Sequence, residues 1–408
     1  MIAAAAVALS LALLTIHRLA GAPTDYETEL ASVRGNAATL EGRARGDPEA
    51  AARVPRQRYQ LALLTGRPAD LAEAGAAIDG AIRDLGPLAD LYLLKASLDL
   101  RLHRVDAADR ALADLQRFAG NAQVVAMKAS LAFQRGDYAA AKAGYLTAIE
   151  KNPTLDNLVR LAYWESKFGD REVADRLYER AQGAVSVKDK RSYAWVTLER
   201  GLLELNRGRY ANAGAHYETA ARAYSGYWLV DEHVAELRGA ERKFDQAIAL
   251  YESIIARAPR PEFQQALGDL FRAMGKDARA KPWHDRALAG YLQSAQRGEV
   301  HYYHHLAGFY ADVLHDGAEA VKWARKDVAL RPHFFTQDAL AWALYRDGQF
   351  AAGLDTARTA LASGANDAHL VFHVAMIHLA AGRTDEGKRL VQRVAQINPG
   401  YENFHVHR

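Results

Sequence analysis

Histidines are unevenly distributed along this chain of 408 residues, because eleven of the 15 lie in residues 284–408. Four of them form two pairs, each separated by one helical turn: His301 with His305, and His369 with His373. Imidazoles at this spacing project from one face of a helix and can bind a shared Zn, Cu or Ni ion. One hypothesis is therefore a divalent-metal site where the four converge, in a metal-binding accessory protein. The alternative is that they are partly buried, hydrogen-bonded helix residues, with His405 and His407 on a solvated tail.

Other reactive groups are scarce. The chain has no cysteine, which excludes disulfides, thiolate metal ligands and a cysteine nucleophile. It also lacks a phosphate-binding P-loop, a Gly-x-Ser-x-Gly nucleophile elbow and a dinucleotide-binding glycine motif after a strand. Lys and Arg number 52 against 49 Asp and Glu, without a long basic block, so nucleic acid is not an expected partner. We therefore expect a protein that is not an enzyme and has no cofactor, unless the metal hypothesis holds.

The N-terminal end resembles an export signal. Residues 2–16 are an unbroken apolar or small run, which is short for a membrane span but typical of a signal-peptide core. Ala20-Gly21-Ala22 fits a small-x-small cleavage site, so residues 1–22 are predicted to be a signal peptide. The alternatives are an uncleaved anchor, in which residues 2–16 tether the protein to a membrane, and a start codon assigned too late. Export to a bacterial periplasm, with or without inner-membrane anchoring, also fits the absence of cysteine.

The remainder repeats with one period. From about residue 55 to residue 400, short helical patterns alternate with glycine-containing turns, and equivalent small residues recur mostly every 33–34 positions. Two steps are longer, near residues 183–191 and 290–300, where we expect longer second helices. The predicted organisation is a leader at 23–54, units 1–4 at 55–186, units 5–7 at 187–293, units 8–10 at 294–400 and a tail at 401–408.

These units resemble the tetratricopeptide-repeat (TPR) family, of bacterial exported type. The clearest unit is Ala122–Pro153, in which Gly136 ends the first helix, Tyr138 packs the second and a proline closes the unit. The eighth unit departs from the pattern, because Gly317 replaces the usual aromatic residue and Asp327 the usual alanine. The resemblance implies an all-α, right-handed solenoid of about ten helix pairs. It also implies a concave groove that binds peptides or protein segments, and no catalytic residues.

The family's groove positions can be mapped onto this chain. In the middle units they place Trp195 and Asn206 on the concave face. In the later units the predicted binding residues are Glu232, Glu236, Asp269, Tyr302, His305, Asp312, Phe335, Asp338, Trp342, Tyr345 and His369. This aromatic and acidic surface would suit an apolar or basic peptide. The sequence thus favours a non-enzymatic scaffold that binds a protein or peptide partner, and it leaves the oligomeric state open.

Overall fold

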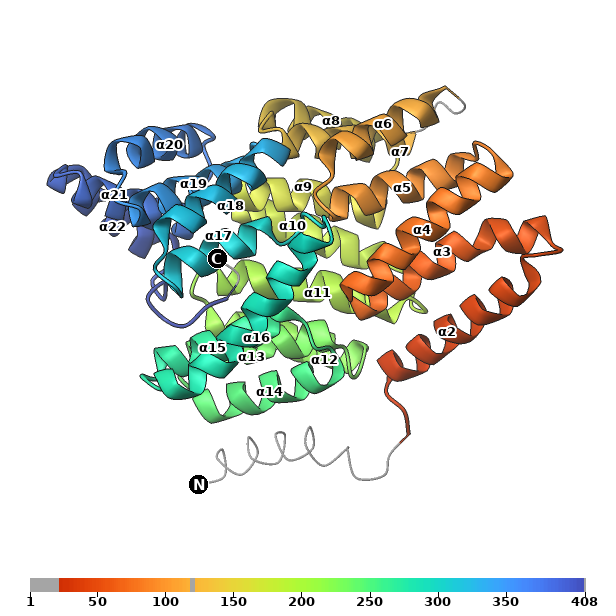
Figure 1. The fold of residues 1–408 in the computed structure, drawn as a ribbon, viewed down its shortest axis with the longest axis horizontal. Coiled ribbons are helices and arrows are strands. Elements are labelled where there is room, and N and C mark those ends of the chain that lie inside the picture. Colours follow the sequence, from red (N-terminus) through yellow and green to blue (C-terminus); the bar gives the residue numbers. More distant parts are fainter. Residues whose placement is uncertain (1–21, 118–121, 407–408) are drawn as a thin grey trace.

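The computed structural model describes residues 22–117 and 122–406, and every helix or strand in these ranges is an α-helix (Figure 1). Helix α2 precedes ten consecutive helix pairs. The helices are α2 (Asp25–Arg43), α3 (Pro48–Thr65), α4 (Pro68–Leu85), α5 (Ala89–Arg101), α6 (Val105–Gln116), α7 (Ala122–Gln134), α8 (Tyr138–Lys151), α9 (Leu155–Phe168), α10 (Arg171–Gly183), α11 (Lys190–Leu205), α12 (Tyr210–Ala223), α13 (Trp228–Ala240), α14 (Phe244–Arg257), α15 (Pro261–Ala273), α16 (Asp277–Gln296), α17 (Tyr303–Asp312), α18 (Gly317–Leu330), α19 (Phe334–Arg346), α20 (Phe350–Ala362), α21 (Ala368–Ala380) and α22 (Thr384–Ile397). The expected all-α solenoid of about ten pairs is confirmed.

The described residues include only part of the N-terminal region. The predicted signal or anchor segment lies outside the described residues, apart from Ala22, and so does the whole of the tether at residues 2–16. Among the helices that are described, none combines the length and the apolar character needed to cross a bilayer. The predicted leader contains α2, which begins at a capping box formed by Thr24 and Glu27.

Each pair is held together by close helix packing at small residues. In α11, a Cβ at Gly201 would overlap the ring of Tyr217 on α12, and in α15 a Cβ at Gly268 would overlap His284 on α16. These glycines therefore permit the two helices of a unit to approach each other closely. Gly308 on α17 differs, since no atom of the described chain lies within 4 Å of the Cβ position there.

The two longer units use their additional residues differently. Helix α16 has 20 residues, as expected for an extended second helix. Helix α10 has only 13 and ends at Gly183, so the additional residues form the connection to α11. The expectation of a longer second helix is therefore correct for the seventh unit and wrong for the fourth.

The eighth unit shows why its sequence departs from the repeat. A side chain at Gly317 would overlap the backbone of Asp347, which packs directly on this helix start. Asp327, only 1% exposed, forms an ion pair with Arg331, whose Nε lies 2.8 Å from its Oδ1. Burial alone would raise the pKa of Asp327, but the His304 ring and the Arg331 guanidinium together hold it below its usual range. A buried ion pair thus occupies the place of the usual alanine.

The array also packs against itself. The amide of Phe334 donates to the Tyr138 hydroxyl (2.6 Å) across 196 residues of sequence. The indole of Trp228 donates to the Leu64 carbonyl (2.8 Å) across 164 residues. With a period of 33–34 residues, such contacts join units that are about five or six apart. One hydrophobic core accordingly includes residues of α7–α11 together with residues of α19–α22, which lie side by side in Figure 1.

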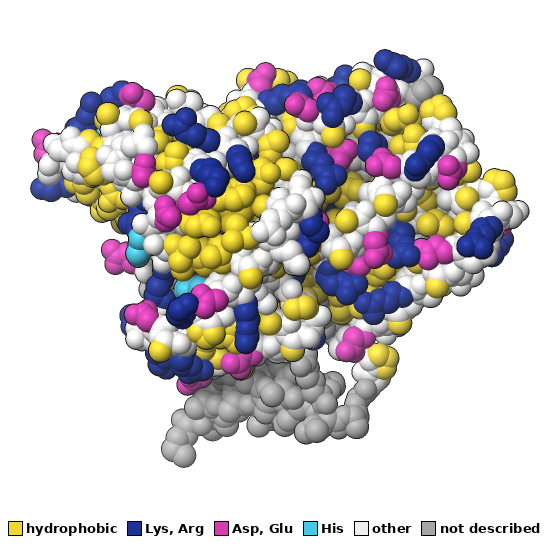
Figure 2. Space-filling model, in the orientation of Figure 1, with side chains coloured by type: hydrophobic (Ala, Val, Ile, Leu, Met, Phe, Trp, Pro, Cys, Tyr) yellow, Lys and Arg dark blue, Asp and Glu magenta, His cyan; other side chains and the backbone are white. Residues whose placement is uncertain are grey.

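The outer surface is mixed in charge. Figure 2 shows Lys and Arg interspersed with Asp and Glu over one face of the molecule, with hydrophobic side chains gathered near its centre. This agrees with the small formal charge of +3 and with solvated outer helix faces.

Candidate functional site

A cavity lies where the middle units meet the C-terminal units. It has a volume of about 630 Å³, within the range of ligand-binding sites. Its aromatic wall comes from elements far apart in sequence: Tyr163 on α9, Trp195 on α11, Phe335 on α19 and Tyr401 after α22. Tyr163 is 43% exposed although it is a large hydrophobic residue inside this enclosure. The predicted concave residues Trp195 and Asn206 both line this cavity.

An ion pair closes one side of the cavity. Lys167 at the end of α9 lies 2.7 Å from Asp367, which caps the N-terminus of α21. Burial lowers the pKa of Lys167, but the Asp367 carboxylate outweighs this effect and raises it. Conversely, burial would raise the pKa of Asp367, but the Lys167 ammonium holds it well below its usual range. Both groups are therefore charged at neutral pH.

The C-terminal segment, residues 398–406, lies along the same cavity and is not a solvated tail. Tyr401 is 9% exposed, and the Tyr210 hydroxyl donates to the Gly400 carbonyl (3.1 Å). The ring of Phe404 packs so closely on α13 that a Cβ at Gly239 would overlap it. The segment thus occupies part of the inner surface in an irregular, non-helical conformation.

Two predicted groove residues on α13 are buried. Glu232 and Glu236 on α13 are 2% and 0% exposed. The amide of Val406 donates to Glu236 Oε1. Neither carboxylate is therefore open to solvent, and the chain's own C-terminal segment contacts that of Glu236.

Three further predicted residues make contacts within the protein. The Tyr302 hydroxyl, on a residue 3% exposed, donates to Glu262 (3.0 Å). His305 is half-buried against Tyr291, and burial lowers its pKa to about 4. Asp269 lies 3.0 Å from the His284 ring nitrogen. Each has an intramolecular role, and their part in binding remains a prediction.

The other predicted residues gather around a second, smaller cavity of about 50 Å³. It is lined by Asp312, Phe335, Asp338, Trp342 and His369, among others. The Trp342 indole donates to Asp312 (2.9 Å) and stacks on Tyr345, with ring centroids 4.8 Å apart. These predicted residues therefore lie close together around a small space, and their part in binding remains a prediction.

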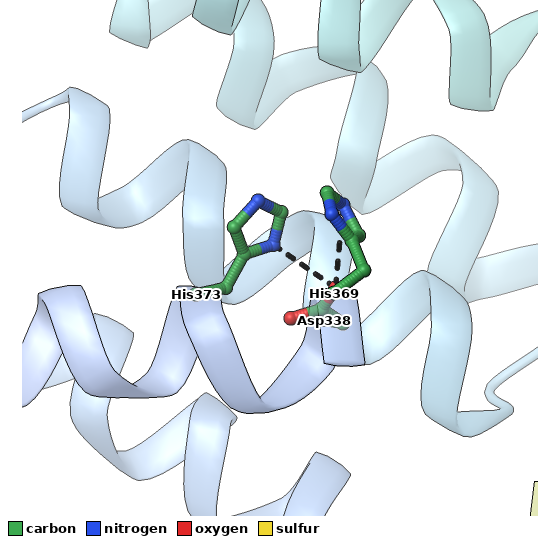
Figure 3. Close-up of side chains that lie close together, drawn as sticks. All are labelled: Asp338, His369 and His373. Carbon is green, nitrogen blue, oxygen red and sulfur yellow. Dashed lines mark hydrogen bonds and ion pairs between the residues drawn. The ribbon is translucent and has the colours of Figure 1, made fainter. Parts of the chain in front are cut away.

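Asp338, His369 and His373 converge at this small cavity (Figure 3). Asp338 Oδ2 lies 3.0 Å from His373 Nδ1 and 4.0 Å from His369 Nε2. Asp338 is 2% exposed, and burial raises its pKa to about 7, which the neighbouring His369 partly opposes. Such a cluster can bind a cation or share a proton between carboxyl and imidazole.

The metal hypothesis as first drawn needs correction. The structure brings His369 and His373 together, with ring centroids 3.9 Å apart. Within the described ranges, the metal-compatible cluster that they join has Asp338 as its third member and includes neither His301 nor His305. His301 instead packs on Tyr302, with ring centroids 4.1 Å apart. His301 precedes α17, so the prediction that it shares one helix with His305 is wrong. Helices α17 and α21 are not adjacent along the array, so spacing within a helix could not show which histidines meet.

Sequence reasoning missed two sets of functional candidates. Lys167 and Asp367 carried no local signal, since they lie 200 residues apart. Tyr401 and Phe404 follow the last helix, where a tail is ordinarily solvated. Their aromatic character was the one available indication that this segment packs on the protein.

Comparisons with known proteins add little beyond the architecture. No family model matches the chain, and no curated protein matches it. Similar solved structures include the APC/C hetero-tetramer Cut9–Hcn1 (15% identity, 86% of this chain and 70% of that chain, TM-score 0.44). Others are the human IFIT1 dimer with PPP-AAAA (13% identity, 88% of each chain, TM-score 0.44) and a tetratricopeptide repeat protein from Parabacteroides merdae (15% identity, 63% of this chain and 98% of that chain, TM-score 0.41). All three TM-scores lie below 0.5, so the solenoid assignment rests on the helix pairing of this chain itself.

Proposed function

We propose that this protein is a non-catalytic interaction scaffold that binds a segment of a partner protein in its 630 Å³ cavity. The observation that supports this most directly is the partly exposed aromatic wall formed by Tyr163, Trp195 and Phe335. Aromatic side chains supply large contact area at low entropic cost, as in other peptide-binding surfaces.

The C-terminal segment indicates what kind of ligand the inner surface accepts. It is irregular, its Gly400 carbonyl and Val406 amide are hydrogen-bonded to helices, and its aromatic side chains fill hollows. A partner segment with similar features would find the same chemistry in the adjoining cavity. We therefore propose an extended, aromatic-containing peptide as the ligand.

A random-peptide display library, selected on the full chain, tests this proposal. The affinity of a selected peptide should fall at least about tenfold in Trp195→Ala, a loss of about 1.4 kcal/mol. Leu146→Ala is the matched control, because Leu146 is 49% exposed and does not line the cavity. No enriched peptide, or equal binding by both variants, would contradict the proposal.

We also propose that the chain is exported to a periplasm. The apolar run at residues 2–16 and the absence of cysteine support this. Fusion of residues 1–40 to a reporter enzyme that is active only after export tests it, with Leu9→Arg and Leu11→Arg together as the control. Reporter activity that is absent, or unchanged in the control, would contradict export.

A further inference from the structure

The first helices of the last two units meet at a polar cluster, which lines the smaller cavity. Asp338 projects from α19, and His369 and His373 project from successive turns of α21 (Figure 3). The Trp342 ring lies flat against His373, with centroids 4.0 Å apart and planes at 9°. This stacking fixes the imidazole orientation and screens one side of the cluster from water.

The ligand atoms of this cluster already lie near coordination distance. One ligand atom from each of the three residues lies within 4.8 Å of the other two. Ligands of a tetrahedral zinc ion, bound at about 2.0–2.1 Å, are about 3.3 Å apart. The distances of 3.0 Å and 4.0 Å from Asp338 Oδ2 to the two imidazole nitrogens bracket that value.

Two further observations distinguish the cluster from an ordinary hydrogen-bonded core. Asp338 Oδ1 is buried and accepts no hydrogen bond within the described chain. The adjoining cavity of about 50 Å³ is large enough for a water or another small ligand at an additional coordination position. A buried carboxylate oxygen without a donor costs free energy, and a cation would remove that cost.

The surroundings also provide an outer-shell partner. His369 Nδ1 lies 3.0 Å from the Tyr401 hydroxyl, which leaves Nε2 directed toward Asp338. Metal-bound histidines commonly use their second nitrogen in this way, since the hydrogen bond fixes ring orientation and tautomer.

We propose that Asp338, His369 and His373 bind one divalent transition-metal ion, with zinc as the reference case. Two imidazoles and one carboxylate suit Zn²⁺, Co²⁺ or Ni²⁺ better than Mg²⁺ or Ca²⁺, which prefer oxygen ligands. On binding, the ion replaces the proton that lies between His373 Nδ1 and Asp338. A proton carried by the Asp338 carboxyl is released to solvent, whereas a proton carried by Nδ1 of the neutral ring moves to Nε2 of that ring. This site goes beyond the proposed peptide-binding role and does not depend on it.

Titration of the chelator-treated full chain with Zn²⁺ and Co²⁺ tests the site. We expect one ion per chain, a dissociation constant below about 10 μM, a higher melting temperature and a visible cobalt absorption band typical of low coordination number. His369→Gln and Asp338→Asn should each weaken binding at least about tenfold and abolish the cobalt band. Asp338→Asn is nearly isosteric and keeps the site testable if the histidine variant folds poorly, which circular dichroism of the metal-free proteins would show.

Two histidine variants outside the cluster serve as matched controls. His378→Gln lies on the same helix, and His405→Gln lies on the C-terminal segment. Both should retain wild-type stoichiometry and cobalt spectrum. No binding to the wild-type chain, or binding that His369→Gln and Asp338→Asn leave unchanged, would overturn the proposal.

Discussion

Lys167 Nζ and Asp367 Oδ2 lie 2.7 Å apart although 200 residues separate them in the sequence. The amide of Asn366 also donates to the Lys167 carbonyl at 2.7 Å. The end of α9 is thereby joined to the beginning of α21. This contact joins two distant parts of the array beside the cavity, whereas a simple solenoid would leave these parts separate.

Loss of one partner of this ion pair should strongly destabilise the contact between α9 and α21. Lys167→Met leaves the Asp367 carboxylate, which is 14% exposed, without its cation. We expect this to lower the free energy of unfolding by about 3 kcal/mol. Asp367→Asn should cost a similar amount while keeping an N-cap side chain on α21. The double variant should lose less free energy of unfolding, measured by urea denaturation, than the two single variants lose in sum. Strict additivity would show that the pair contributes no coupling energy.

Glycines on first helices should respond differently to the same substitution. Gly201→Ala places a methyl group against the Tyr217 ring, and we expect the free energy of unfolding to fall by about 1–3 kcal/mol. Gly308→Ala has open space, so the higher helix propensity of alanine should make it neutral or stabilising by up to about 1 kcal/mol. Thermal and urea unfolding of both variants checks this. Equal effects would argue against the packing explanation.

Release of the C-terminal segment should expose the inner surface. Phe404→Ala removes the ring that fills the hollow at Gly239, whereas Glu402→Ala, an exposed neighbour, is the control. Hydrogen exchange of amides in residues 398–406 should accelerate in the first variant only. Unchanged exchange in Phe404→Ala would mean that other contacts hold the segment.

Stability should depend on pH through Glu262. Burial alone would raise its pKa, but Arg260, 2.5 Å away, lowers it to about 2. His305 also faces this carboxylate, and Tyr302 donates a hydrogen bond to it. The folded-state pKa of Glu262 lies below the unfolded value of about 4.3. The ionised carboxylate therefore makes its full contribution to the free energy of unfolding above about pH 4.3, and this contribution declines as the pH falls toward 2.

The stability difference between wild type and Glu262→Gln should therefore narrow below about pH 4.5, by up to about 3 kcal/mol in total. Urea midpoints measured from pH 6 downward would show this. Asp90→Asn removes one side of an exposed ion pair with Arg56 and should have an effect near zero at every pH. A difference for Glu262→Gln that stays constant with pH would contradict the assignment.

The sequence by itself determined the helix pairs. Small residues and turn glycines recur every 33–34 positions, and Gly136 and Gly348 adopt the positive φ angles that end a helix. These features act within one unit or between neighbours, so a single unit shows them. The sequence also placed Asp338, Trp342 and His369 on related faces, which the small cavity brings together.

Only the tertiary structure decided which distant units meet. The rotation between successive units is small, but it accumulates over five or six units, and connections such as residues 184–189 alter it. The accumulated rotation brings α9 to α21 and Trp228 to Leu64, and it places the C-terminal segment over Glu236. The cluster of Asp338, His369 and His373 instead forms between the neighbouring helices α19 and α21, and His301 and His305 lie outside it. Spacing within one helix gives no information about the rotation accumulated over several units, because it determines only the face on which a side chain lies.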